Sequence, residues 1–108
     1  MAETEPTGEA YCAVEVATED GMPVIRLSGE LDTVSMPRVR PVVEGVLTAE
    51  SDRLAFDVTA LEFMDSSGVA LLVSAVRKAR HVELRHPAPI VRRLIELTGL
   101  TELLLMVP

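Results

Sequence analysis

The spacing of hydrophobic residues switches repeatedly along this chain between every second residue and every third or fourth residue. Alternation is the period of a half-buried strand, whereas the wider spacing lines one side of a helix. The pattern predicts strands over residues 11–17, 24–31, 53–58, 82–85 and 103–107, and helices over 35–50, over 68–79 and from Pro89 to a stop at Gly99. This order of elements is typical of an α/β domain.

The connections between the predicted strands determine their directions. Only the turn signal Glu19-Asp20-Gly21 separates the first two strands, so we expect an antiparallel hairpin. Each later pair is separated by a helix, and a helical crossover returns the chain to run parallel. The sequence therefore predicts a mixed, mostly parallel sheet of about five strands with three or four helices.

The length of 108 residues and the hydrophobic content of 48% favour one domain with one core. We place this domain at residues 11–108 and expect residues 1–10, which are polar and contain Pro6 and Gly8, to be a disordered acidic tail. The start of the chain lacks the pattern of a signal peptide, and no apolar run reaches the length of a membrane span. The lone Cys12 has no partner for an internal disulfide, so we interpret it as a small apolar strand residue of a cytoplasmic protein.

The charge of the chain argues against nucleic acid and anionic membranes as partners. The formal net charge is −7, and six acidic residues precede the first base, Arg26. Such a chain repels phosphate groups. The aromatic residues are only Tyr11, Phe56 and Phe63, too few for a surface on which bases could stack.

Two prolines fall in the first predicted helix. Pro37 suits a first turn, where Ser35 is available as the cap. Pro41 lies far enough into the segment to remove an intrahelical donor. We therefore expect a kink at Pro41 or a later start of this helix.

The stretch FMDSSGVALL, residues 63–72, puts an acid, two hydroxyls and a glycine between two apolar segments. It lies where the chain leaves the third strand region and enters the second helix, and loops of this kind hold ligands and partners in α/β proteins. Asp65, Ser66 and Ser67 could all cap the helix, and capping alone would explain them. The residues themselves leave open whether the motif is a cap or a functional site.

Catalysis is not favoured by the remaining residues. A serine hydrolase needs a G-x-S-x-G turn and a nearby histidine, but the first glycine is missing and His81 and His86 follow the second helix. The stretch FDVT, residues 56–59, resembles a strand that carries a phosphorylated aspartate, here Asp57. It lacks a second nearby acid for general-acid chemistry. Neither metal-ligand spacing nor a glycine-rich phosphate loop occurs, so we expect no enzyme activity, no metal and no cofactor.

Three stretches resemble the STAS domain family, in the branch of bacterial anti-sigma factor antagonists: LSGELD (27–32), LEFMDSSGVALL (61–72) and HPAPIVRRLIELTGL (86–100). They occur in the family's order and near its spacing. The resemblance implies a monomeric binding protein whose unmodified form binds an anti-sigma factor that is also a serine kinase, so that a sigma factor is released and transcription begins.

The resemblance also implies the residues of the switch. The kinase would phosphorylate the second serine of D-S-S-G, here Ser67, and a serine phosphatase would reverse the modification. The partner surface would include Asp32, Thr33, Met64, Asp65, Ser66 and Gly68. Spacing alone does not rank adjacent hydroxyls, so Ser66 remains the alternative acceptor.

The family leaves a second role open. STAS domains also act as transporter regulatory modules, stress-signalling scaffolds and subunits of lipid-trafficking complexes. A short chain with an intact D-S-S-G motif favours the sigma-regulatory role, but fold-level likeness does not identify the partner.

Overall fold

The computed structural model describes residues 11–48 and 52–108. In chain order the elements are β1 (Cys12–Glu19), β2 (Met22–Leu31), α1 (Met36–Thr48), β3 (Arg53–Met64), α2 (Ser66–Lys78), β4 (His81–Arg85), α3 (Pro89–Thr98), the short 3-10 helix η1 (Leu100–Glu102) and β5 (Leu105–Val107). The α/β fold class is confirmed. The expected acidic tail and the predicted end of the first helix near Glu50 lie outside the described residues.

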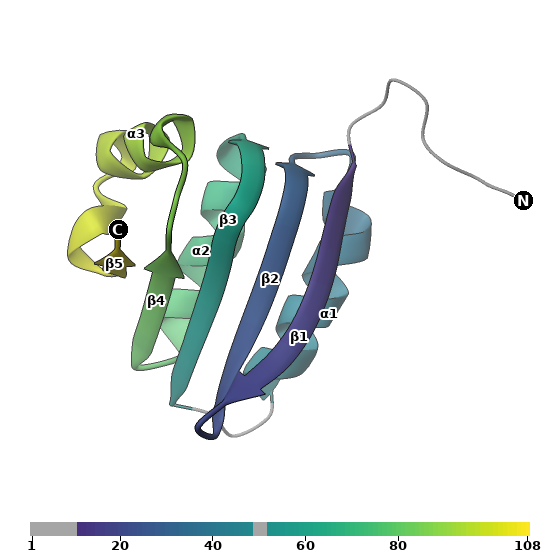
Figure 1. The fold of residues 1–108 in the computed structure, drawn as a ribbon, viewed down its shortest axis with the longest axis vertical. Coiled ribbons are helices and arrows are strands. Elements are labelled where there is room, and N and C mark those ends of the chain that lie inside the picture. The colour runs from purple at the N-terminus through teal and green to yellow at the C-terminus, as the bar shows by residue number, and fades with distance from the viewer. Residues whose placement is uncertain (1–10, 49–51) are drawn as a thin grey trace, which may run out of the picture.

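The strands form one sheet in the order β1-β2-β3-β4-β5 (Figure 1). β1 and β2 are antiparallel, and every later neighbour pair is parallel, as predicted. The hairpin loop is only Asp20-Gly21, and both residues have positive φ, 51° and 81°. This is the loop geometry that matches the right-handed twist of two paired strands.

The two central crossover helices lie on the same face of the sheet. The chain moves in one direction across the sheet from β2 to β5, and right-handed crossovers then put each intervening helix on the same side. Figure 1 shows α1 and α2 behind the sheet, with no helix in front of β1, β2 or β3. The main core fills the space beneath these helices, and α3 adds Val91 and Ile95 to it.

The first helix differs from the prediction. α1 begins at Met36 and contains Pro41, so the later start was wrong, and the expected kink stays a prediction. Pro37 and Pro41 both lie on the exposed side of the helix. Pro41 denies the Pro37 carbonyl its helical donor, and on an exposed side of a helix water can take the place of that donor.

Ser35 does not cap α1 with its side chain. Its buried hydroxyl donates to the carbonyl of Glu30 at 3.0 Å and accepts from the amide of Asp32 at 3.1 Å. The carboxylate of Asp32 instead accepts from the amides of Val34 and Ser35 at 3.1 and 3.0 Å. An aspartate turn thus precedes the helix.

The observed ends of some other elements also differ from the predicted ends. β3 continues past its predicted end at Val58 to Met64, with register shifts against β2 that break the simple alternation of side chains. α3 ends as predicted at Gly99, whose φ of 80° is the left-handed conformation of a helix stop. β5 begins only at Leu105, because the amides of Leu103 and Leu104 both donate to the Leu100 carbonyl in the turn that follows η1.

Candidate functional site

The D-S-S-G motif lies at the carboxyl end of β3, where the chain turns directly into α2. Met64 is the last strand residue, Asp65 is the N-cap, and Ser66 begins the helix, so Ser66 is not the cap. The amide of Asp65 donates to the carbonyl of Leu31 at 3.2 Å, which joins the carboxyl ends of β3 and β2. The turn of residues 32–35 therefore lies beside the motif.

The Asp65 carboxylate is the centre of this site. Its Oδ1 atom accepts from the amide of Ser67 at 2.8 Å and from the Ser67 hydroxyl at 2.5 Å, and its Oδ2 atom accepts from the amide of Thr33 at 3.4 Å. Partial burial alone would raise the pKa of Asp65, but the hydroxyl and amide of Ser67 stabilise the charged form, and the pKa is lowered. A carboxylate, charged at neutral pH, thus orients the serine.

The two serines differ in their surroundings. Ser66 is exposed, whereas Ser67 is partly exposed and its hydroxyl is bound to Asp65. Thr33 is exposed across from them, and the next residue, Val34, is 68% exposed. Ser67 is therefore partly open to solvent at the head of α2, and it is not sealed inside the core.

Met64 and Gly68 lie beneath this surface. Both are buried, and a Cβ atom added to Gly68 would lie 2.5 Å from Met64 Cγ and 3.0 Å from Leu31 Cδ2. The absence of a side chain at Gly68 thus lets α2 pack closely on the ends of β2 and β3. These two residues would affect a partner through the surface that they support, and their role as contacts stays a prediction, as does that of Asp32.

An apolar hollow along α1 adjoins the site and was missed from the sequence. Its volume is about 350 Å³, and it is lined by Thr33, Met36, Pro37, Arg40, Pro41 and Glu44. Arg40 and Glu44 form an ion pair of 3.5 Å beside it. The only sequence signal for this hollow was the pair of prolines four residues apart, which places two ring surfaces on one side of the helix.

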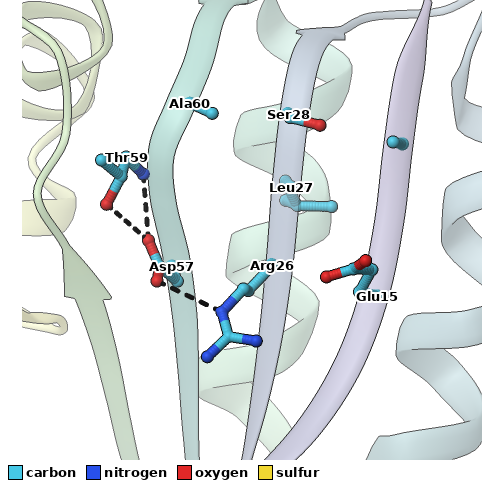
Figure 2. A pocket seen from close by; sticks show the side chains of 8 residues that line it. Glu15, Arg26, Leu27, Ser28, Asp57, Thr59 and Ala60 are labelled. Carbon is cyan, nitrogen blue, oxygen red and sulfur yellow. Dashed lines mark hydrogen bonds and ion pairs between the residues drawn. The ribbon is translucent and has the colours of Figure 1, made fainter.

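The uncovered face of the sheet has a second hollow of about 270 Å³ (Figure 2). Asp57 points toward Thr59 and Arg26 there: its carboxylate accepts from the Thr59 amide and hydroxyl at 3.1 and 2.6 Å, and lies 3.6 Å from the Arg26 guanidinium. Burial would raise the pKa of Asp57, but these donors and the nearby cation lower it. These contacts give the Asp57 carboxylate hydrogen-bond donors and a counter-charge, which is a structural role.

Other reactive groups in the described ranges give no further site. Among residues 11–48 and 52–108, no group of three or more His, Cys, Asp and Glu side chains could hold a metal ion. Cys12 is 3% exposed, and burial raises the pKa of its thiol to about 11, which agrees with its interpretation as an apolar strand residue.

Within the same described ranges, no helix is both long and apolar enough to span a membrane.

The fold and this site define a known class of domain. The STAS domain model matches residues 13–108, and the chain belongs to the STAS domain family. The match covers β1 after its first residue and every later element.

Individual relatives are similar over most of the chain. An anti-sigma F factor antagonist of Lysinibacillus sphaericus is 30% identical over 92 residues, which are 81% of this chain and 78% of that protein. An anti-sigma factor antagonist from Mycobacterium paratuberculosis has a crystal structure with a TM-score of 0.85 and 29% identity, covering 91% of this chain and 86% of the other.

A third relative, SpoIIAA, is an anti-sigma factor antagonist whose structure is known with and without phosphate. The unphosphorylated form has a TM-score of 0.75 and 26% identity, with 89% of each chain covered. The phosphorylated form has a TM-score of 0.69 and 25% identity, covering 89% of this chain and 92% of that one.

Proposed function

We propose that this chain is an anti-sigma factor antagonist controlled by phosphorylation of Ser67. The unmodified protein binds an anti-sigma factor that is also a serine kinase, and the sigma factor is thereby freed to activate transcription. Phosphorylation releases the antagonist, and a serine phosphatase restores it. The protein acts by binding as a monomer in the cytoplasm.

The observation that carries this proposal is the surface position of Ser67 at the head of α2, in a chain whose relatives are anti-sigma factor antagonists. A phosphate there adds about 1.5–2 negative charges at pH 7. The amides at the start of α2 accommodate an anion, so the domain remains folded. A partner surface shaped for a hydroxyl does not accommodate it, and a hundredfold loss of affinity requires only about 2.7 kcal/mol.

The site assignment is tested by incubating the protein with the candidate anti-sigma kinases of its own genome and ATP, followed by mass spectrometry. We expect phosphate on Ser67, none on the Ser67→Ala variant, and normal modification of the matched control Ser66→Ala. Undiminished phosphorylation of Ser67→Ala would remove this assignment.

The switch itself is tested with a negative charge at each serine. Ser67→Asp should weaken binding to the kinase at least about tenfold, equivalent to about 1.4 kcal/mol, with nearly unchanged thermal stability. Ser66→Asp carries the same charge one residue away and should weaken binding less. Unfolding of Ser67→Asp would mean that the serine is structural. Equal losses of binding affinity in Ser67→Asp and Ser66→Asp would mean that the partner responds to the added charge and not to its position. Co-purification with a membrane transporter in place of a kinase would favour the alternative role of a regulatory module.

A further inference from the structure

We propose that Asp65 is a positioning residue that transmits phosphorylation of Ser67 to the turn of residues 32–35. The inference rests on the proposed function, because it assumes that Ser67 is the modified residue. It concerns the hydrogen bond between the Asp65 carboxylate and the Thr33 amide, which joins two segments 32 positions apart in the sequence.

Three contacts hold the D-S-S-G motif against the segment that leaves β2. The Asp65 amide donates to the Leu31 carbonyl at 3.2 Å, and Gly68 packs against the Leu31 side chain. The third contact is the 3.4 Å hydrogen bond from the Thr33 amide to Asp65 Oδ2. Only this third contact uses a group that also binds the Ser67 hydroxyl.

Phosphorylation replaces an attractive contact at Asp65 with a repulsive one. The phosphate ester at Ser67 Oγ no longer has the proton that the hydroxyl donates to Asp65 Oδ1. The dianion also lies beside a carboxylate that its donors keep charged, and like charges repel. The amides at the start of α2 can bind the phosphate instead. The carboxylate then turns away, and the Thr33 amide loses its acceptor.

The consequence reaches surface beyond the serine. Thr33 lines the α1 hollow, and Val34 beside it is 68% exposed. The rest of the turn is held separately, because the amides of Val34 and Ser35 donate to Asp32. Phosphorylation should therefore loosen the Thr33 end of the turn and leave the Asp32 turn intact.

The experiment uses the full chain with phosphoserine genetically encoded at position 67, so that no kinase is needed. Amide exchange with solvent is measured by NMR. We expect the Thr33 amide to exchange about fivefold faster in the phosphorylated protein, which is the effect of losing one exposed hydrogen bond. The amides of Val34 and Ser35 should be unchanged. An unchanged Thr33 rate would overturn the inference.

Two variants separate this coupling from a purely structural role of Asp65. Asn also caps helices, but Asp65→Asn has one acceptor oxygen in place of two. Thr33 should therefore exchange about fivefold faster in this variant without phosphate and no faster with it. The matched control Ser67→Ala removes the hydroxyl without adding charge and should leave Thr33 unchanged. A phosphate effect that persists in Asp65→Asn would overturn the inference. A failure of the proposed function would instead appear as absent kinase binding and would not alter these amide rates.

Discussion

Gly68 shows how one missing side chain lets α2 begin close to the ends of β2 and β3. A Cβ atom there would overlap Met64 and press on Leu31, whereas a Cβ atom at Gly45 of α1 would meet nothing within 4 Å. Gly68→Ala should therefore lower the free energy of unfolding by about 1–3 kcal/mol, less the gain in helix propensity. Urea unfolding measures this change.

The matched control is Gly45→Ala, which gains helix propensity without any overlap. It should raise the free energy of unfolding by about 0.5–1 kcal/mol. If Gly68→Ala stabilised the protein as much as Gly45→Ala, the close packing described for α2 would be contradicted.

The two prolines of α1 allow a similar comparison for a whole helix. Pro41 is the sixth residue of α1 and denies its helix one hydrogen bond, whereas Pro37 is the second residue, whose amide would have no helical acceptor. Pro41→Ala should thus stabilise the protein by about 1–3 kcal/mol, and Pro37→Ala should change its stability by less than about 0.5 kcal/mol. Thermal unfolding of both variants is the measurement, and equal effects would contradict the continuous helix.

Periodicity predicted the five strands and the three α-helices, but it predicted neither η1 nor all of the ends. The strands and helices were found because alternation and helical spacing both survive in the buried residues, such as those of β2 and α3. The second half of β3 was missed because exposed Thr59, Ala60 and Glu62 interrupt its apolar pattern, and bulges against β2 allow this. Local rules do not anticipate a bulge whose cause is the neighbouring strand.

The motif was visible in the sequence, but the hydrogen bonds that connect it to the rest of the domain were not. The acid and the hydroxyls of D-S-S-G stand together, so Asp65 was one of the predicted caps. The hydrogen bond to Thr33 depends on the parallel register that sets Leu31 opposite Met64. Such a register is a property of the assembled sheet, so sequence alone indicated Thr33 only by resemblance.

The whole molecule is a sheet with one helix-covered face and one charged face. On the uncovered face, Glu19 reaches Arg85 at 2.8 Å and Arg26 at 3.7 Å, and Arg26 continues to Asp57 at 3.6 Å. Beneath these side chains lies a small separate core of Met22, Val24 and Ala55. The ion pairs thus lie on the face of the sheet opposite α1 and α2. They link residues of β1, β2, β3 and β4.

Acid sensitivity should come from Asp57 within β3 and from Asp65 directly after the same strand. The pKa values of Asp57 and Asp65 are lowered in the folded protein, whereas an unfolded Asp has a pKa of about 3.9. The unfolded chain then binds more protons than the folded one as the pH falls through this range. The stabilisation is complete above about pH 5 and is lost as the pH falls below about 4 toward the folded-state values.

Urea unfolding at a series of pH values measures this loss, and Asp65→Asn separates one contribution. At pH 7 the variant should be less stable by about 0.5–1 kcal/mol, because Asn caps α2 without a charge to favour the helix dipole. The difference should shrink as the pH falls below about 4 and vanish once the pH is below the lowered pKa of Asp65, where the wild-type carboxyl is protonated. Ser67→Ala is the milder control, since the Ser67 amide still donates to the carboxylate, and its pH dependence should lie between the other two. A difference between Asp65→Asn and wild type that stays constant from pH 7 to pH 3 would show that the charge of Asp65 does not stabilise the fold.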